Sequence, residues 1–594
     1  MARPGSIQER IAALPKGSII MKRINGREYE YWQFYENGKQ ICRRVKGEEL
    51  EQLKIQIEER KRLQAQLKNR ASSEAAESAT ETLGEDHFSG MIRTGRELVR
   101  YAEPVKNYLK REIYHHLESY IHGPHTDRVL ILYGLRRTGK TTMIRQLIWN
   151  MPQEKREKAA FIQVAAGGTL GELKRLLRTL EKAGYQYVFI DEVTLLADFI
   201  EGAALLSDVF AASGMKIVLS GTDSLGFVFA EDEQLFDRCM LLHTTMIPYR
   251  EFENVLGIRG IDQYIHYGGT MSVGGVRYNE TPFSSPARTN EYIDSAIAGN
   301  IQHSLRYYQD GGHFRALYDL YEKNELTSAI NRVVEDMNHR FTLEVMTRTF
   351  VSHDLGLSRR NLLKDRENPT DALETIDPDA VTQRIRTLLE IRNQEEQHIP
   401  ITAEHVREIQ EYLEILDLIR YVDVVISGSS EKPRKRTIFT QPGLRYAQAE
   451  ALIVSLMQDN SFRSIGVRER IWITQRILNE IRGRMMEDII LLETKEAFPE
   501  KQVSVLQFAA GEIDMAVFDP VSISCDLYEI KHSTETAPEQ YRHLTDPKKL
   551  DEIGKQYGTI QGKHVIYRGE DAEREGIRYL NAEQYLLSLR RETQ

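Results

Sequence analysis

The sequence predicts an α/β protein of several domains, built around a parallel β-sheet. At 594 residues the chain is too long for one hydrophobic core, and about three to five domains are expected. From about residue 90 to residue 254, apolar runs typical of buried strands alternate with helical patterns. This alternation predicts a parallel sheet that carries helices on both faces.

A glycine-rich loop lies between the first of these strands and the first of these helices. The strand is the apolar run Val129–Tyr133, and the helix includes Thr142–Ile148. The loop fits G-x-x-x-x-G-K-[ST], in which backbone N–H groups and a helix N-terminus face phosphate oxygens. We therefore expect bound ATP, with Lys140 on its β- and γ-phosphates and Thr141 on Mg²⁺. The residues expected to hold the nucleotide are Gly134, Leu135, Arg136, Arg137, Thr138, Gly139, Lys140, Thr141 and Thr142.

A second apolar strand, Tyr187–Ile190, ends in two carboxylates. Asp191 is expected to hold the magnesium shell, and Glu192 to orient and polarise the attacking water. This pair predicts hydrolysis of the nucleotide as well as binding.

Two further positions are candidates for sensing or stabilising the γ-phosphate. The strand Lys216–Ser220 runs into a polar turn, where Thr222 or Ser220 could contact the γ-phosphate; a turn that only caps the next helix is the alternative. Arg238 could act as an arginine finger, and a structural ion pair is the alternative for that residue.

The first 70 residues predict a small module, a three-stranded antiparallel sheet followed by a charged helix. Asn25-Gly26 and Asn37-Gly38 are hairpin-turn signals. The module carries 16 Lys and Arg against 9 Asp and Glu, a charge of +7, whereas the rest of the chain carries −16. Aromatic residues on its central strand suit either stacking on nucleic-acid bases or contact with a protein. The expected strands are Ile19–Ile24, Arg27–Glu36 and Lys39–Val45.

Four segments are expected after this module. Residues 71–89, rich in Ala, Ser, Glu and Thr, predict a linker, and residues 90–254 the ATPase core. Residues 255–340 predict a helical lid. Residues 341–450 predict a winged-helix-like domain, because the amphipathic stretch Ala403–Leu418 is followed by a hairpin. Basic residues on this wing could contact DNA or simply be solvated: Lys432, Arg434, Lys435 and Arg436.

Residues 451–594 contain a second cluster of catalytic residue types. Two strand-like runs, Ile513–Phe518 and Cys525–Lys531, are joined by a turn. In a hairpin, Asp514 would lie opposite the neighbourhood of Glu529, and Lys531 would share a face with Glu529. Two carboxylates and an ammonium group suit Mg²⁺ binding and attack on a phosphodiester. Glu487, on a predicted helix, could add a third acid. The spacing alone is also compatible with a solvated hairpin.

The composition indicates the cellular compartment in which these activities would take place. The three cysteines, Cys42, Cys239 and Cys525, are too far apart to suggest a disulfide framework or a zinc site. No apolar signal region or membrane-length apolar run is present, so a cytoplasmic protein with no membrane partner is expected. A homo-oligomer is among the states that the sequence leaves open.

The chain resembles a prokaryotic family of P-loop ATPases that carry a C-terminal PD-(D/E)xK nuclease-like domain. The resemblance covers about residues 90–594 and implies an AAA-like (ASCE) core, a winged-helix region and a restriction-endonuclease-like C-terminus. It implies nuclease roles for Asp514, Glu529 and Lys531, and a less secure one for Glu487. Gln441 departs from the family, whose members tend to carry an acid there. The matching motifs are Gly134–Thr142, Phe189–Val193, Leu219–Thr222, Tyr249–Phe252, Gly268-Gly269, Phe439–Leu444 and Gly483–Glu487.

Two functions of different classes follow. In one, ATP binding or hydrolysis controls a DNA-cleaving domain, with DNA as the partner, in a defence, mobile-element or repair context. In the other, the protein is a regulatory ATPase switch whose nuclease-like domain binds without cutting. An intact set of Asp514, Glu529 and Lys531 favours the first, and the acidic body favours the second.

Overall fold

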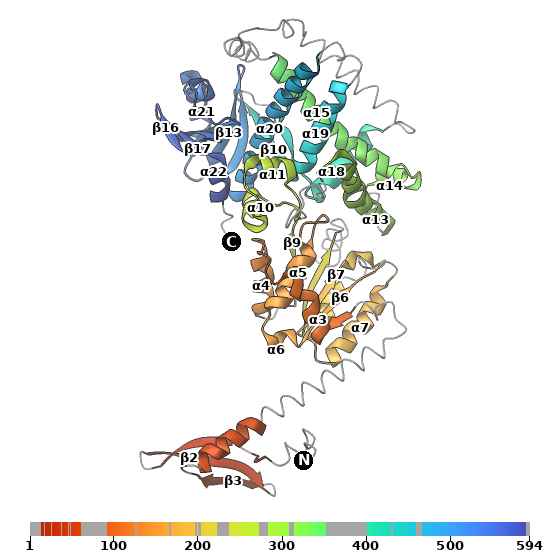
Figure 1. The fold of residues 1–594 in the computed structure, drawn as a ribbon, viewed down its shortest axis with the longest axis vertical. Helices are drawn as coiled ribbons and strands as arrows, with labels where there is room; N and C mark the ends of the chain where they lie inside the picture. The colour runs from red at the N-terminus through yellow and green to blue at the C-terminus, as the bar shows by residue number, and fades with distance from the viewer. Residues whose placement is uncertain are drawn as a thin grey trace.

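The computed structural model describes most of the chain (Figure 1). The described residues are 14–16, 18–24, 27–36, 39–45, 47, 49–60, 92–124, 127–165, 168–196, 199, 204–222, 237–271, 283–307, 314–351, 401–428, 432–458 and 466–589. The expected linker, 71–89, and residues 352–400 of the expected winged-helix region lie outside them.

The N-terminal module contains the predicted three-stranded sheet. Its strands are β1 (Ser18–Ile24), β2 (Arg27–Glu36) and β3 (Lys39–Arg44), all antiparallel, and residues 49–60 are helical. Ile24 pairs with Arg27, and Glu36 with Lys39, so each connection has two residues, as the Asn-Gly signals predict. The meander prediction is confirmed.

The predicted parallel sheet is the centre of the next lobe. It has six strands in the order β4-β6-β7-β8-β5-β9, parallel except for the β4–β6 pair. The strands are β4 (Ile92–Thr94), β5 (Val129–Tyr133), β6 (Ala159–Gln163), β7 (Tyr187–Asp191), β8 (Lys216–Gly221) and β9 (Cys239–His243). The helical segments are α3 (Gly95–Ala102), η1 (Glu103–Val105), α4 (Tyr114–His122), α5 (Lys140–Asn150), α6 (Gln153–Arg156), α7 (Leu170–Lys182), η2 (Val193–Leu195) and η3 (Leu206–Ala211).

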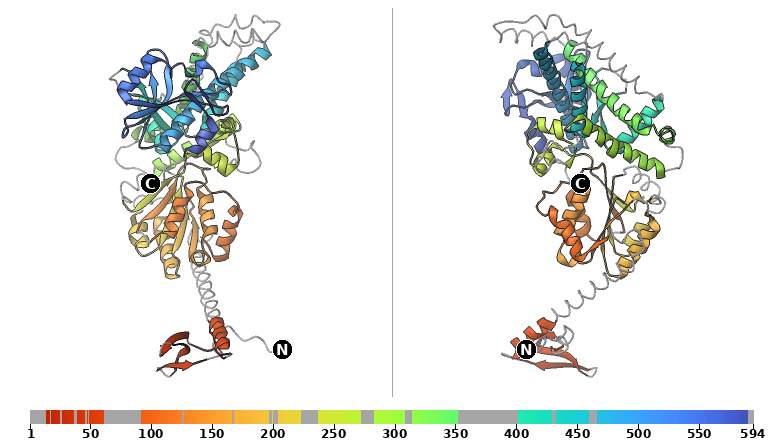
Figure 2. Two further views of the ribbon diagram at one scale, coloured as in Figure 1. Left: turned by 90° about the vertical axis from the view of Figure 1, so that its left-hand side faces the viewer. Right: turned by 45° about the vertical axis from the view of Figure 1, so that its right-hand side comes forward.

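Helices cover both faces of this sheet (Figure 2). Alternate residues of β5 enter different cores: Ile131 packs with α7 and Leu132 with α5. A strand buried on both sides needs apolar residues throughout, which explains the unbroken run Val129–Tyr133. In the sheet, β8 separates β5 from β7, so the glycine-rich loop after β5 and the carboxylates after β7 flank the end of β8.

Helices dominate the described residues between 249 and 415. One of them, α15, runs through residue 340, so the boundary expected there between a lid and a winged-helix domain falls inside a continuous helix. The helical segments are α10 (Tyr249–Leu256), α11 (Ile261–Tyr267), α12 (Pro286–Tyr292), η7 (Ile293–Ala298), α13 (Gly299–Tyr307), α14 (Arg315–Glu322), α15 (Leu326–Val351) and α18 (Ala403–Ile415).

The C-terminal part forms an eight-stranded mixed sheet in the order β11-β10-β12-β13-β14-β15-β17-β16. The strands are β10 (Ile419–Ile426), β11 (Arg434–Phe439), β12 (Gln502–Gln507), β13 (Glu512–Asp519), β14 (Ser524–Lys531), β15 (Thr559–Tyr567), β16 (Ala572–Arg574) and β17 (Ile577–Asn581). The helical segments are α19 (Pro442–Gln458), α20 (Val467–Ala497), η10 (Pro538–Tyr541), α21 (Pro547–Tyr557) and α22 (Ala582–Ser588).

This sheet corrects the predicted division at residue 450. The hairpin β10–β11, expected to be the wing of a separate domain, pairs in parallel with β12 through β10 and so belongs to the C-terminal sheet. The predicted helix before it does form, and Ile409 and Leu413 on its apolar face are buried. Local patterns predict a helix and a hairpin here, but the long-range pairing with β12 decides which domain they join.

Candidate functional site

The glycine-rich loop has a backbone that depends on glycine at two positions. Gly134 has φ 134° and Gly139 has φ 91°, values that disfavour other residues. A Cβ on Gly134 would lie 2.7 Å from Thr244 Oγ1 and 2.8 Å from Thr245 Oγ1. The loop then enters α5, whose first residue is Lys140. The N-terminus of α5 is thus aimed at the space that the loop surrounds, which suits an anion.

Lys140 is buried inside this loop. Its Nζ donates hydrogen bonds to the carbonyl oxygens of Gly134 (2.7 Å) and Leu135 (2.8 Å). Burial lowers the pKa of Lys140 to about 8, although Glu192 and Asp191 oppose that shift. An ammonium group in this position is poised to neutralise phosphate charge, as the sequence predicts.

The two carboxylates after β7 lie beside the loop and differ in their partners. Asp191 is buried; it accepts a hydrogen bond from Thr141 Oγ1 (2.8 Å) and another from Ser220 Oγ. Glu192 turns off the strand with φ 56° and accepts from Thr222 Oγ1 at 3.2 Å. Burial and the nearby Asp191 raise the pKa of Glu192. A carboxylate with a raised pKa suits a general base, and Thr222 fixes its orientation.

A buried ion pair that the sequence does not predict supports the loop. Arg111 Nε donates to Glu251 Oε2 at 2.7 Å, and the two side chains are only 3% and 1% exposed. Arg111 Nη1 also donates to the Thr138 carbonyl in the loop (2.8 Å) and to the Thr244 carbonyl (2.9 Å). Glu251 lies in the quoted motif Tyr249–Phe252, which is the signal that could have found it. No local pattern marked Arg111.

The second lobe also contacts the loop directly. Leu135 is fully buried in a hydrophobic core whose other members come from the α12–α19 region, among them Ile419 and Leu444. Tyr292 OH donates to the Arg136 carbonyl at 3.4 Å. The loop therefore packs against the lobe that contains the eight-stranded sheet.

Gln441 is nearer to this loop than its place in the sequence suggests. Its Nε2 donates to Tyr292 OH and to the Gly269 carbonyl, both at 3.0 Å. Tyr292 bonds in turn to Arg136, so two hydrogen bonds separate Gln441 from the loop. Gln441, where the chain departs from the family, is far from the glycine-rich loop in the sequence but lies close to it in the fold.

Arg238 is not placed to act as an arginine finger on this chain's own site. It directly precedes β9, and its carbonyl accepts from Val129 N at the start of β5, whereas the glycine-rich loop follows the end of β5. Its Nε donates to Asp208 Oδ1 at 2.7 Å on an exposed surface. The structural ion pair, the alternative for this residue, is the arrangement observed.

A second cluster forms where β13 and β14 pair, as the sequence predicts. Met515 pairs with Tyr528, which places Asp514 beside Glu529. Lys531 Nζ donates to Asp514 Oδ2 and to Glu529 Oε2, both at 2.7 Å, and Ile530 N donates to Asp514 Oδ2 at 2.8 Å. Both carboxylates are buried. The three predicted side chains therefore converge on one point.

Their pKa shifts follow from burial and mutual charge. Burial and Asp514 raise the pKa of Glu529 well above its usual range. Burial opposes ionisation of Asp514, but Lys531 and the Ile530 N–H outweigh it and lower that pKa. Partial burial opposes ionisation of Lys531, but the same two carboxylates outweigh it and raise the pKa of that lysine. Lys531 is therefore protonated and Asp514 ionised at neutral pH.

Glu487 lies at the edge of this cluster with its carboxylate already engaged. Glu487 Oε2 accepts from Arg484 Nη1 at 2.5 Å and from Arg436 Nη2 at 3.4 Å. Burial raises the pKa of Glu487, and Asp514 contributes to the rise, which shows that the two acids are close. Arg436, expected on a wing that contacts DNA or is solvated, instead has a side chain only 9% exposed that pairs with Glu487 of α20, whereas Lys435 is exposed.

Whether these residues fit a divalent cation depends on their free oxygens. In the described part of the chain, no group of three or more acidic, His or Cys side chains has metal-site geometry. Lys531 bonds to one oxygen of each carboxylate. However, Glu529 Oε1 is buried without a hydrogen-bond partner among the described residues. A buried, unpaired carboxylate oxygen next to Asp514 suits a hard cation such as Mg²⁺.

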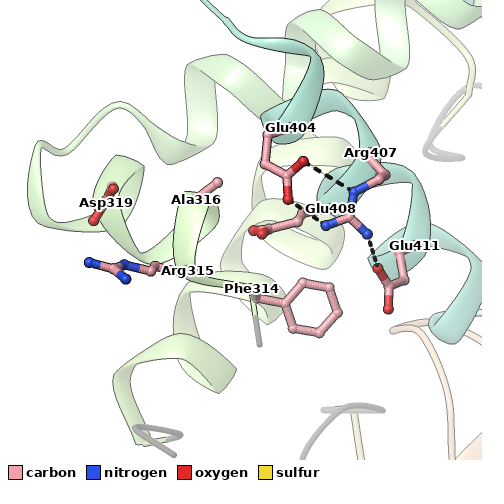
Figure 3. A pocket seen from close by; sticks show the side chains of 8 residues that line it. All are labelled: Phe314, Arg315, Ala316, Asp319, Glu404, Arg407, Glu408 and Glu411. Atoms are coloured by element: carbon pink, nitrogen blue, oxygen red, sulfur yellow. Dashed lines mark hydrogen bonds and ion pairs between the residues drawn. The ribbon is translucent and has the colours of Figure 1, made fainter. Parts of the chain in front are cut away.

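A hollow on the described surface belongs to neither cluster. It measures about 410 Å³ and lies between α14 and α18 (Figure 3). Arg407 pairs there with Glu404 (2.5 Å) and Glu411 (3.5 Å), and Glu408 accepts from Leu317 N (3.0 Å). Three of its acids, Glu404, Glu408 and Glu411, thus accept from neighbouring donors, and none of its lining residues belongs to either cluster.

None of the helices in the described part of the chain combines the length and the apolar character that a membrane span requires.

A comparison with known protein families covers the first cluster. Residues 126–253 match the model of a family described as an AAA domain, and this segment contains the glycine-rich loop and both carboxylates of the β7 end. The chain thus contains an AAA-type P-loop domain in an α/β fold. No curated protein matches the chain.

Two solved structures show partial similarity to this chain. The S. cerevisiae Hsp104–casein complex in its extended conformation shows 17% identity over 36% of this chain and 40% of that chain, with a TM-score of 0.24. The Aeropyrum pernix Orc1 protein in complex with DNA shows 15% identity over 62% of this chain and 99% of that one, with a TM-score of 0.22. The match therefore spans less than half the length of Hsp104. Scores this low carry no argument about function.

Proposed function

We propose that the protein is a Mg²⁺-dependent ATPase whose nucleotide state controls a DNA-cleaving C-terminal domain. The observation that supports it most is the convergence of Asp514, Glu529 and Lys531, in a chain that also carries an AAA domain. ATP would occupy the loop before α5, where Lys140 and the backbone N–H groups bind its phosphates. DNA is the proposed substrate of the second cluster.

At the nucleotide site, this chain's residues divide the work of hydrolysis. A magnesium ion held by Thr141 and Asp191 would supply positive charge to the β- and γ-phosphates. Glu192 orients the attacking water and accepts its proton, a role that its raised pKa supports. Thr222 holds Glu192 in place, so its loss should slow hydrolysis and leave binding intact.

At the C-terminal site, a divalent ion held by Asp514 and Glu529 would supply Lewis-acid activation of a phosphodiester. Lys531 is positively charged, and its half-buried side chain lies between the carboxylates. It can therefore orient the attacking water and offset the negative charge that develops on the phosphate. Glu487, held by two arginines, shapes the charge of the site from α20.

Control of one site by the other is supported by the contacts of the glycine-rich loop. Leu135 shares a core with β10, a strand of the same sheet as β13 and β14. Glu493 on α20 accepts from Tyr249 N at 2.7 Å, and α10 also carries Glu251, the partner of Arg111. A conformational change in the loop on nucleotide binding would thus reach the C-terminal sheet through two sets of packed contacts.

A second function, a regulatory ATPase switch that does not cut DNA, is favoured by a different observation. Lys531 occupies the space between the two carboxylates, and arginines engage Glu487, so the acids already have cationic partners. In that case the C-terminal sheet would bind a partner and report the nucleotide state.

Cleavage and ATPase assays on the purified full-length protein distinguish the two functions. We expect Mg²⁺-dependent cleavage of plasmid DNA by the wild type, loss of cleavage in Asp514→Asn, and unchanged phosphate release from ATP in that variant. Asp551→Asn, which removes an exposed acid that pairs with Lys555, is the matched control and should keep both activities. ATP hydrolysis without cleavage by the wild type would favour the switch.

A further inference from the structure

A basic cluster lies beside the C-terminal site and was not used in the function proposed above. It consists of Arg542, His543 and Lys549, from the connection after η10 and the first turn of α21. Arg542 Nε donates to His543 Nε2 at 3.2 Å, and Lys549 Nζ lies 2.6 Å from His543 Nδ1. The histidine ring thus stands between two cationic groups.

The cluster is fixed against the loop that leads into β13. Lys549 Nζ donates to the Ala510 carbonyl at 2.7 Å. Gly511 has φ 86°, and a Cβ on it would lie 2.5 Å from His543 Cε1, so the ring packs directly on a backbone that only glycine allows. Asp514 follows three residues later. The charges of Lys531 and Asp514 also act on His543, so the basic cluster lies near the second cluster.

The charges of this cluster have no counterion at contact distance. Within the described residues, neither Arg542 nor Lys549 has a carboxylate oxygen within 4.0 Å of its nitrogens, although Lys549 is only 7% exposed. Burial and the two flanking cations lower the pKa of His543 to about 4, so the ring is neutral at pH 7. A neutral imidazole has one lone pair and therefore accepts from only one of its two cationic neighbours. One donor of the cluster is left unmatched.

A bound oxyanion would pair with the cationic side chains and would also accept a hydrogen bond from the unmatched donor. We propose that Arg542, His543 and Lys549 form a phosphate-binding subsite that holds a backbone phosphodiester of DNA beside the Asp514–Glu529–Lys531 centre. The proposal deepens the DNA-acting function proposed above and rests on it. The non-bridging oxygens of a phosphodiester accept from the guanidinium and ammonium groups, and the exposed Arg542 lies where a long anionic strand can reach it. Held there, the strand would lie near the carboxylates.

Salt-dependent DNA binding tests this subsite without any cleavage step. Fluorescence anisotropy of a labelled 20-base-pair duplex, in EDTA, would be measured from about 50 to 300 mM NaCl for the full-length protein. Each lost phosphate contact should reduce the slope of log K against log salt by about 1 and weaken binding about eightfold near 0.1 M salt. We expect this from Arg542→Gln and from Lys549→Gln. Lys555→Gln, which removes an exposed, ion-paired lysine from the same helix, should change neither value.

The possible results distinguish failure of the phosphate-binding subsite from failure of the proposed DNA cleavage. DNA binding that depends on Arg542 and Lys549 in a protein that never cuts supports the subsite and defeats cleavage. Cleavage with an unchanged salt slope in both variants overturns the subsite, and so does absence of DNA binding. Calorimetry with inorganic phosphate covers the other source of this ligand: phosphate binding that Arg542→Gln abolishes, without DNA binding, would show a free-phosphate site and overturn the proposal. If Lys549→Gln does not fold, the exposed Arg542→Gln decides the result.

Discussion

Replacing Arg111 by Met should lower the free energy of unfolding by about 3–5 kcal/mol, the usual cost of removing one partner of a buried ion pair. The Arg111 and Glu251 side chains are 3% and 1% exposed, so water cannot replace the lost guanidinium. Glu251 would keep one donor, the Glu112 N–H at 2.6 Å from Oε1, and would hold an uncompensated charge. The Thr138 carbonyl in the glycine-rich loop would also lose its donor, so nucleotide affinity should fall as well.

The same chain offers a matched control for this substitution. Arg238 Nε and Asp208 Oδ1 are also 2.7 Å apart, but their side chains are 44% and 48% exposed. Solvent screens such a pair, and Arg238→Met should cost about 0–1 kcal/mol. It should also leave ATP hydrolysis by the chain's own site unchanged, because Arg238 lies at the opposite end of β5 from the loop.

Urea titrations followed by tryptophan fluorescence and by far-UV circular dichroism measure both costs. Coincident transitions of the two probes are required before a free energy is assigned. Binding of a fluorescent ATP analogue supplies the second readout. If Arg111→Met cost no more than Arg238→Met, or left nucleotide affinity unchanged, the argument that this buried pair supports the loop would be refuted.

Three further predictions concern the nucleotide site and the N-terminal module. The pKa of Lys140, about 8, should rise when phosphates bind, so ATP affinity should be full below pH 8 and fall above it. Calorimetry at pH 8 in buffers of different ionisation enthalpy should show proton uptake, and identical heats would contradict this. Glu192→Gln should keep nucleotide binding and abolish phosphate release, whereas Lys140→Ala should abolish binding itself; hydrolysis by Glu192→Gln would remove that residue from the mechanism. Deleting residues 1–70 should leave ATP hydrolysis unchanged and make the salt dependence of DNA binding shallower, and equal binding by both proteins would exclude the module from DNA contact.

The sequence determined the features that depend on near neighbours in the chain. The strand, loop and helix around Lys140 follow from an apolar run, two glycines at φ-demanding positions and a helical pattern, all within about twenty residues. The two Asn-Gly turns similarly determined the N-terminal meander. Period-two alternation and a short turn brought Glu529 and Lys531 to one face beside Asp514.

The tertiary structure decided everything that joins distant segments. The Arg111–Glu251 pair spans 140 residues, and the parallel pairing of β10 with β12 moved a predicted wing into the C-terminal sheet. Tertiary packing places Arg238 in an exposed ion pair and Gln441 near the loop. No local sequence pattern indicates either position. Backbone periodicity is set by residues a few positions apart, whereas the burial of a charge or the partner of a strand is set by whichever surfaces meet on folding.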